Sequence, residues 1–306
     1  MAIQDMMVPF ELYQPTTVAE VLALLSRFRV TRGPAHQGDA WLLAGGLDSF
    51  DWLKDRIVKP RVVIDLSQVR ELKGIRRLPD GGLEIGAMTT LTEVVNHPEI
   101  RQRFAVLSWA ARRVATPQIR NQGTLGGNIS QDTRCWYYRS GMPCYRAGGN
   151  TCYADTPTAM NREHCIFEAD RCVAASPSDT APALLVLDAQ MVVRNPRGER
   201  VVAAEDFWIG PSVDITRMTV LEPDDLLVSI RLPATWAGAR FYFEKVSDRQ
   251  AWDFPLVNIA AAVRLANGVI QDIRIAAGGV AARPLRLTAV EQGVRGERIT
   301  EELATL

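Results

Sequence analysis

All five cysteines of this chain lie between Cys135 and Cys172, and the rest of the sequence contains none. A disulfide framework normally extends over a small secreted domain, whereas a local group of cysteines inside a large chain more often binds metal. The count is odd, so at least one cysteine is spare. The window therefore predicts a metal-binding segment within a larger fold.

The spacing of the cysteines differs from the common zinc and ferredoxin motifs. No two of them have the Cys-x-x-Cys spacing of a zinc ribbon, and they do not form the tight run of a bacterial ferredoxin. Such long gaps predict a loop wrapped around its metal. His164 could complete a mixed zinc site, but a lone histidine in a loop more often faces solvent, and we expect that here.

The composition argues against two kinds of partner. Of the 306 residues 47% are hydrophobic, and 35 basic residues balance 35 acidic ones. A chain of this length can bury a large core and form two domains. A neutral chain without a run of Lys and Arg lacks the basic field that nucleic acid or an anionic membrane surface requires.

The sequence contains no evident targeting feature. Its first ten residues lack a basic stretch followed by an apolar run, and no apolar stretch approaches the ~18 residues that span a bilayer. We therefore expect no direct membrane insertion and a cytoplasmic location by default. A partner that carries a signal could still take the chain to the periplasm.

The order of the expected elements indicates an α+β fold. Hairpins and helices are interleaved, and no Gly-x-Gly-x-x-Gly motif follows a strand, so neither a doubly wound parallel sheet nor a Rossmann site is expected. Capping boxes begin at Thr17 and Thr90. The expected helices are 18–25, 49–58, 104–114, 181–187 and one from about 285, and the expected strands are 41–44, 61–66, 83–87, 191–194, 199–202, 226–232, 241–246, 260–265 and 269–276.

The first of two glycine-rich segments, residues 43–49, lies between an expected strand and an expected helix. Without side chains at Gly45 and Gly46, the backbone amides can approach a ligand closely, and the helix start favours an anion. Taken alone, such a glycine pair is most often only a tight turn.

The second glycine-rich segment comprises residues 122–130. It combines backbone donors with Thr124, Asn128 and Ser130, whose side chains can hydrogen-bond phosphate or ribose oxygens. Two such segments suggest two phosphates, although this segment on its own could equally be a plain connection.

Together with two further blocks, these segments resemble the FAD-binding subunit of the xanthine dehydrogenase and carbon monoxide dehydrogenase family of molybdenum hydroxylases. The matching blocks are 44–46, 119–128, 177–179 and 245–262, in the family's order and approximate spacing. The resemblance implies an α+β protein with a two-part FAD-binding domain of the CO dehydrogenase flavoprotein type, residues 1–236. Across a linker at 233–238, a smaller C-terminal α+β domain, residues 237–306, would cover the flavin.

The resemblance also implies which residues bind FAD. The pyrophosphate is expected at both glycine segments, the adenosine or ribitol part at Asp179, and the isoalloxazine ring near Leu226 and Lys245. A lysine there would stabilise the anionic reduced flavin and raise its potential. The implied set is Ala44, Gly45, Gly46, Leu47, Asp48, Ser49, Thr124, Gly126, Gly127, Asn128, Ser178, Asp179, Leu226 and Lys245.

Asp48 departs from the family pattern. Family members often carry Asn, Ser or His in this part of the first segment. An acid beside a diphosphate is electrostatically unfavourable unless Asp48 caps the following helix.

The cysteine window resembles an insertion, here residues 132–175, of one family branch that includes 4-hydroxybenzoyl-CoA reductase and periplasmic aldehyde oxidoreductase. In that branch the insertion binds a four-iron four-sulfur cluster through four thiolates. The resemblance therefore implies Cys135, Cys144, Cys152 and Cys172 as ligands and Cys165 as the spare cysteine. Five inert buried cysteines are disfavoured by their confinement to one window.

The implied function is electron transfer within a larger complex. The chain has no second cysteine set for two-iron clusters and nothing that resembles a molybdopterin domain. A large molybdopterin subunit and a small two-iron two-sulfur subunit are therefore expected as partners, with this FAD exchanging electrons with an external acceptor or donor. The implied residues bind and tune the cofactors, and none is proposed to act as a catalytic acid, base or nucleophile.

Substrate identity depends on the molybdenum subunit. An aldehyde is favoured slightly, because the sequence around Cys144 is closer to the aldehyde oxidoreductase branch, while an aromatic CoA thioester and an N-heterocycle stay open. Two other classes also stay open: a zinc-stapled scaffold subunit without a working flavin, and a free-standing flavin oxidase.

Overall fold

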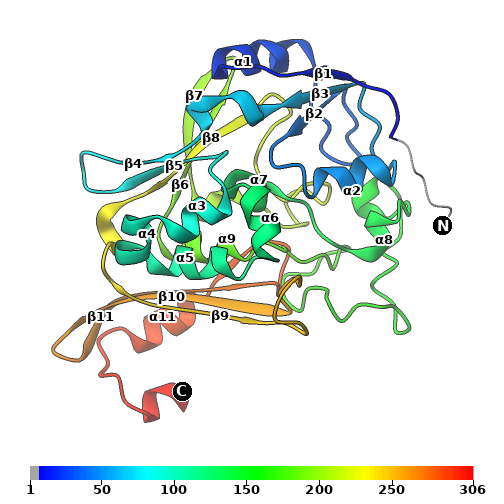
Figure 1. The fold of residues 1–306 in the computed structure, drawn as a ribbon. Coiled ribbons are helices and arrows are strands. Elements are labelled where there is room, and N and C mark those ends of the chain that lie inside the picture. Colours follow the sequence, from blue (N-terminus) through cyan, green and yellow to red (C-terminus); the bar gives the residue numbers. More distant parts are fainter. Residues whose placement is uncertain (1–6, 306) are drawn as a thin grey trace.

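The computed structural model describes residues 7–305 and contains three β-sheets with helices between and around them (Figure 1). A three-stranded parallel sheet has the order β1-β3-β2. Its strands are β1 (Glu11–Tyr13), β2 (Ala40–Leu43) and β3 (Val62–Asp65). Helix α1 (Val18–Arg27) starts with the expected capping box, in which Thr17 accepts from the Glu20 amide at 3.2 Å.

Helix α2 (Ser49–Lys54) follows β2 and is shorter than the expected helix 49–58. Asp55 closes it, and Arg56 has a φ of 52° in the left-handed region, which ends a helix in the usual way. The residues between β2 and α2 form the first glycine segment, as the sequence predicts.

The second sheet is antiparallel and has five strands in the order β4-β5-β8-β6-β7. They are β4 (Ile75–Arg77), β5 (Leu83–Gly86), β6 (Gln190–Asn195), β7 (Gly198–Ala203) and β8 (Leu226–Leu232). The turn of the β4–β5 hairpin forms as expected, with the Gly82 amide donating to Asp80 Oδ1 at 2.8 Å and a φ of 84° at Gly81.

The third sheet is antiparallel with the order β12-β11-β10-β9. It comprises β9 (Arg240–Val246), β10 (Val257–Ala266), β11 (Val269–Gly278) and β12 (Leu285–Arg286). Asn267 and Gly268 have φ values of 53° and 79°, as the predicted two-residue turn requires. The terminal helix, α11 (Thr288–Val294), starts later than expected because residues 285–286 pair with β11.

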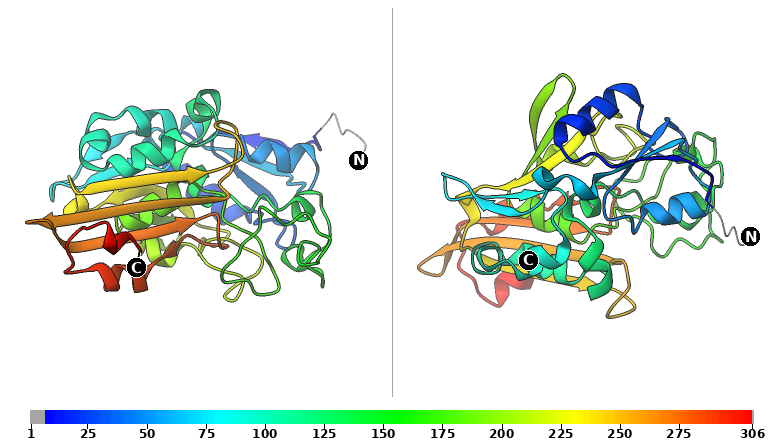
Figure 2. Two further views of the ribbon diagram at one scale, coloured as in Figure 1. Left: turned by 90° about the horizontal axis from the view of Figure 1, so that it is seen from below. Right: turned by 45° about the horizontal axis from the view of Figure 1, so that its top comes forward.

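A layer of helices separates the five-stranded sheet from the four-stranded sheet, which faces the viewer in the left view of Figure 2. Small residues such as Ala260, Ala262 and Ala276 let α5 and α9 approach β10 and β11. Helix α4 was not expected from the sequence. The helices are α3 (Leu91–Asn96), α4 (Pro98–Arg103), α5 (Ala105–Arg112), α6 (Pro117–Gln122), α7 (Leu125–Ser130), α9 (Thr180–Val186) and α10 (Ala204–Phe207).

The cysteine segment, residues 132–175, is mostly irregular. It contains α8 (Trp136–Arg139) and a 3-10 turn (Tyr145–Ala147), and it lies beside α2 at one end of the molecule (Figure 1). Contacts of Trp52 and Val58 with Tyr138 and Cys144 form a small core of their own there. Within residues 7–305, no helix is long and apolar enough to cross a membrane.

Candidate functional site

The two glycine segments lie against each other. A methyl group on Gly45 would come within 2.2 Å of the Gln122 carbonyl oxygen, so this close approach requires glycine. The Cβ atom of Ala44 lies 3.7 Å from the place that a Cβ on Gly127 would take. The fold therefore joins two segments that are far apart in the sequence.

The second glycine segment is helical, which the sequence did not predict. Thr124 caps α7 by accepting a hydrogen bond from the Gly127 amide at 3.1 Å. The Gly126 amide donates to the Ala87 carbonyl oxygen at 2.9 Å. The backbone donors expected at Gly126 and Gly127 are therefore used within the protein, and Gly126 serves close packing against Ala87.

The first glycine segment keeps backbone donors available. The amides of Gly46 and Leu47 donate to no other residue in the described part of the chain. Gly46 has a φ of 82°, a left-handed conformation that favours glycine. The turn from Ala44 to Ser49 can therefore offer amides to an anion.

The side chain of Asp48 does not cap α2, although Asp48 occupies the N-cap position. It is paired with two arginines of the cysteine segment. Arg139 Nη1 lies 2.9 Å from Asp48 Oδ1, and Arg134 forms a second ion pair with the same oxygen atom. Trp52 Nε1 also donates to Asp48 Oδ2 at 3.2 Å. The two arginines therefore balance the negative charge of Asp48. Helix capping does not explain why an acid is tolerated at this position.

Asn128 is held by two hydroxyl groups, one from Ser178 in the block 177–179 and one from Thr180 just beyond it. Ser178 Oγ and Thr180 Oγ1 donate to Asn128 Oδ1 at 2.7 and 2.6 Å. This arrangement leaves the Asn128 amide nitrogen as the donor that can reach a phosphate or ribose oxygen. Ser178 therefore orients Asn128, and Thr180 is a contributor that the sequence did not single out.

Asp179 and Lys245 form a buried ion pair at the start of α9. Lys245 Nζ lies 2.6 Å from Asp179 Oδ2, and it also donates to the carbonyl oxygens of Asp253 at 2.7 Å and Arg113 at 3.1 Å. Asn258 Nδ2 donates to Asp179 Oδ1 at 2.9 Å. The three oxygen atoms that accept from Lys245 Nζ match the three N–H donors of an ammonium group. The side chain of Lys245 is therefore held in place in the interior.

Burial raises the pKa of Asp179 to about 6, although Lys245 and Asn258 oppose the rise. Removing a carboxylate from water disfavours its charged form, and full burial outweighs the nearby ammonium group. Contact of either residue with the flavin stays a prediction.

Leu226 lies in a different part of the core. It is buried at the start of β8, in a cluster that includes Val18, Ile64 and Val228. The structure therefore brings Asp179 and Lys245 together but packs Leu226 among other apolar side chains. Its expected position near the isoalloxazine ring stays a prediction.

The cysteine segment brings Cys135 near the other three expected ligands. All five cysteines are free thiols. Burial raises the pKa of Cys135, and the neighbouring Cys144 and Cys152 contribute to the rise. Burial also raises the pKa of Cys172 to about 11, with contributions from Cys152 and Cys135. Cys135 therefore lies within electrostatic range of the other three expected ligands, and Cys165, the expected spare cysteine, lies within range of Cys152 as well.

His164 is buried, so the expectation that it faces solvent is wrong. Its Nε2 atom lies 3.2 Å from Cys135 Sγ. Burial lowers the pKa of His164, which favours the neutral ring. A spacing argument could not have found this contact, because 29 positions separate the two residues in the sequence.

The cysteine segment does not form a closed single-ion site in this structure. Among residues 7–305, no three His, Cys, Asp or Glu side chains lie close enough together to hold one metal ion. The amides of Tyr137 and Tyr138 point at Cys135, and that of Ala174 at Cys172. Such donors tune iron–sulfur clusters.

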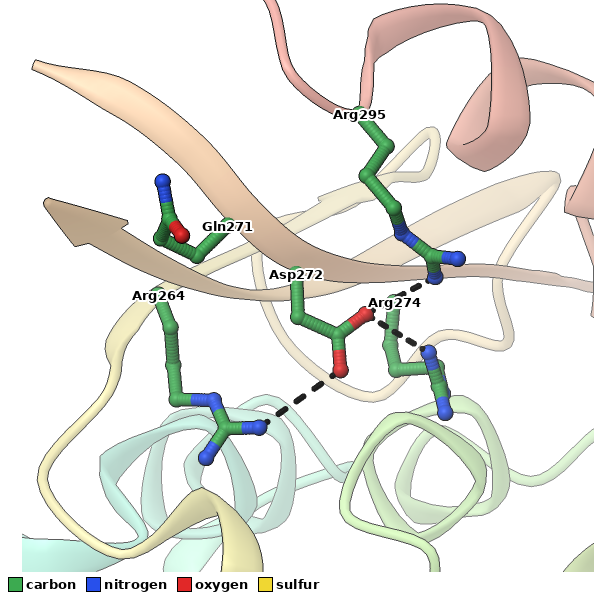
Figure 3. A pocket seen from close by; sticks show the side chains of 5 residues that line it. All are labelled: Arg264, Gln271, Asp272, Arg274 and Arg295. Carbon is green, nitrogen blue, oxygen red and sulfur yellow. Dashed lines mark hydrogen bonds and ion pairs between the residues drawn. The ribbon is translucent and has the colours of Figure 1, made fainter.

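A surface hollow at the end of the β10–β11 hairpin lies outside this site (Figure 3). Asp272 pairs there with Arg264, Arg274 and Arg295, so the acid is shared among three cations. None of the residues predicted to bind FAD or metal lines it. We therefore do not assign the cofactor to this hollow.

Two family models match the chain. The FAD binding domain in molybdopterin dehydrogenase covers residues 8–235, and the CO dehydrogenase flavoprotein C-terminal domain covers residues 242–305. The aldehyde oxidoreductase FAD-binding subunit PaoB of Escherichia coli is 35% identical over 82% of this chain and 78% of its own length. The carbon monoxide dehydrogenase medium chain of Hydrogenophaga pseudoflava is 29% identical over 96% of this chain and 82% of its own length.

Solved structures give the same result for the fold. Carbon monoxide dehydrogenase from Hydrogenophaga pseudoflava superposes with a TM-score of 0.72 at 30% identity, over 97% of this chain and 84% of that chain. Quinoline 2-oxidoreductase from Pseudomonas putida superposes with a TM-score of 0.72 at 25% identity, over 98% of this chain and 84% of that chain. The chain therefore belongs to the family of FAD-binding subunits of molybdenum hydroxylase-type oxidoreductases.

Proposed function

We propose that this chain carries FAD and one four-iron four-sulfur cluster, and that it transfers electrons within a complex with a large molybdopterin subunit and a small two-iron two-sulfur subunit. The single observation that supports the cluster assignment is the confinement of five free thiols to residues 135–172, in a segment that packs against Trp52 and Leu53 of α2. When bound, FAD exchanges one electron at a time with iron–sulfur centres and two with an external acceptor or donor.

Each part of the chain has a distinct task in this proposal. The turn at Gly46 and Leu47 donates backbone hydrogen bonds to the FAD diphosphate, because these amides have no partner within the described chain. The amide nitrogen of Asn128, oriented by Ser178, supplies a side-chain donor nearby. The Asp179–Lys245 pair sets the charge beside the flavin-binding region.

The Asp179–Lys245 pair affects the expected reduction potential of the flavin. A lone lysine near the ring would raise the potential, but a lysine neutralised by a carboxylate at 2.6 Å has a weaker effect. We therefore propose that Asp179 moderates the influence of Lys245, with Asn258 holding the carboxylate in place.

An aldehyde is the proposed substrate class of the complex, acting at molybdenum on the large subunit. This step rests on the similarity to the aldehyde oxidoreductase subunit, which is 35% identical to this chain. A competing hypothesis assigns zinc to the cysteine segment, and the contact of His164 with Cys135 favours it. A free-standing oxidase would bind FAD without partner subunits.

Anaerobic purification of the chain co-expressed with its neighbouring large and small subunits tests the proposal. We expect flavin absorbance, copurifying partners and about four irons that depend on the cysteine segment of this chain. Zinc in place of these irons would support the scaffold hypothesis, and flavin binding without partners would support the free-standing oxidase. Turnover of an aldehyde, but not of an N-heterocycle or an aromatic CoA thioester, would identify the substrate class.

A further inference from the structure

We propose that Arg134 and Arg139 are positioning residues of the FAD site, which neutralise Asp48 so that an acidic turn can accept a diphosphate. Nothing in the sequence pattern or the family resemblance assigns a role to either arginine. The inference rests on the proposed function, because it takes the turn from Ala44 to Ser49 as the diphosphate site. It makes the cysteine segment a part of that site.

The side chain of Arg139 is held in place by contacts within the protein. Its guanidinium group lies 3.9 Å from the centre of the Trp52 ring. Its Nε atom donates to the Thr133 carbonyl oxygen at 2.7 Å, and its Nη2 atom donates to the Asp132 carbonyl oxygen at 3.1 Å. Only 11% of its side chain is exposed. Such a group keeps its charge in one place at no further entropic cost.

Arg134 gives the second balancing charge. It pairs with Asp48, and its Nη2 atom lies 3.0 Å from Asp51 Oδ2. The face of Phe254 holds the guanidinium group at 5.0 Å. The side chains of Asp48 and Arg134 are 27% and 32% exposed, so water screens their interaction only in part.

The four charges that pair around Asp48 sum to zero. Asp48 and Asp51 carry two negative charges, and Arg134 and Arg139 carry two positive charges. Removal of one arginine would leave an uncompensated carboxylate beside a ligand group that is itself anionic. Like charges at this range repel, and the repulsion is strongest where water is excluded.

Both arginines flank Cys135, the first proposed cluster ligand. Arg134 precedes it, and Arg139 ends the short helix α8 that follows it. The chain that would hold the cluster is therefore the same chain that carries the balancing charges to the diphosphate turn. Disorder of the cysteine segment would therefore displace the two arginines and weaken FAD binding.

A purely structural role makes a different prediction, which allows a sharp test. If the ion pairs only fasten the segment to the domain, Asp48→Asn and Arg139→Gln should both weaken FAD binding, because each breaks the link. If the arginines instead neutralise the unfavourable charge of Asp48, the two variants should change FAD affinity in opposite directions. Asp48→Asn removes one acid and leaves two cations and Asp51, a net charge of +1, beside the diphosphate.

The experiment measures FAD dissociation constants of the full chain by fluorescence quenching, after removal of bound flavin. We expect Arg139→Gln to weaken binding roughly tenfold, which corresponds to ~1.4 kcal/mol. Asp48→Asn should bind FAD as tightly as the wild type or more tightly, and the double variant should return to within about threefold of the wild type. Arg197→Gln, which breaks an exposed pair with Asp224, is the matched control and should change nothing.

Two probes localise the effect to the phosphates. ADP contains a diphosphate and should reproduce the pattern of FAD, whereas riboflavin contains no phosphate and should bind all variants alike. Weakened FAD binding in Asp48→Asn, or a double variant as weak as Arg139→Gln, would overturn the inference. Equal FAD affinity in all variants would overturn it too, while a wild-type chain that binds no FAD would instead overturn the proposed function.

Discussion

Lys245 Nζ lies 2.6 Å from Asp179 Oδ2, and both side chains are almost completely buried. Asp179 stands at the start of α9, within the region that matches the FAD binding domain, and Lys245 lies on β9, within the region that matches the C-terminal domain. This contact therefore joins the two matched regions in their interior. A buried pair of this kind is sensitive to the loss of either partner, because the remaining charge has no water around it.

A double-mutant cycle on this pair should show strong coupling. Lys245→Met leaves the Asp179 carboxylate buried without its partner and should lower the free energy of unfolding by about 3 kcal/mol. Asp179→Asn together with Lys245→Met removes both charges and should recover at least half of that loss. Urea unfolding followed by circular dichroism measures both. Additive effects of the two substitutions would contradict the coupling.

The cost of Lys245→Met should increase as the pH rises through about 6. The folded-state pKa of Asp179, raised by burial to about 6, exceeds the ordinary value of 3.8, so the folded protein holds this proton more tightly than the unfolded chain. Its contribution to stability is therefore present at low pH and is lost as the pH rises through that interval. Without Lys245 the pKa rises further.

The measurement is the difference in Tm between wild type and Lys245→Met at pH 5 and at pH 7.5. We expect the larger difference at pH 7.5, where the carboxyl group is ionised. Because other carboxylates titrate in both proteins, the comparison between variants isolates Asp179. A double variant that also carries Asp179→Asn should lose this pH dependence, and a difference that shrinks at high pH would refute the assignment.

Local structure was largely predictable from the sequence, because local chemistry determines it. The capping box at Thr17 and the turn at Asn267 and Gly268 each contain their determinants within four residues, and the structure confirms both. The glycine segment at 122–130 was misjudged as a loop, because a short helix capped by Thr124 occupies residues 125–130, whose glycines suggest a loop.

The site was less predictable, because its contacts join distant parts of the chain. Asp48 and Arg134 are 86 positions apart, and Lys245 and Asp179 are 66 positions apart. No period or spacing encodes such a pair. The burial of His164 was missed for the same reason, because only the fold of the segment places this residue against Cys135.

Gly45 should tolerate no side chain. A methyl group there would lie 2.2 Å from the Gln122 carbonyl oxygen, so Gly45→Ala must push the two glycine segments apart. We expect a loss of about 1 to 3 kcal/mol in stability, as for other overpacked sites, and a lower FAD content. Thermal unfolding and the flavin-to-protein absorbance ratio measure the two effects.

Gly293→Ala is the control for this substitution. Gly293 lies in α11, and a methyl group there meets no atom within 4 Å. Alanine is the better helix former, so this variant should match or exceed the wild type by up to ~1 kcal/mol. If Gly45→Ala retained full FAD content while Gly293→Ala behaved as expected, contact between the glycine segments would be irrelevant to cofactor binding.

Serine substitutions should separate the four proposed ligands from the spare cysteine. Each of Cys135→Ser, Cys144→Ser, Cys152→Ser and Cys172→Ser removes one thiolate and should abolish the iron of the cysteine segment, because a four-iron cluster requires four ligands of this kind. Cys165→Ser should retain it. His164→Gln should retain iron as well, but it removes the side chain next to Cys135 Sγ and should shift the cluster potential. Iron analysis and the visible spectrum of the anaerobic complex measure these outcomes. If iron survived Cys135→Ser but were lost in Cys165→Ser, Cys165 would be a ligand and Cys135 the spare cysteine. If the segment bound zinc and this zinc depended on His164, the site would hold a single ion and no cluster.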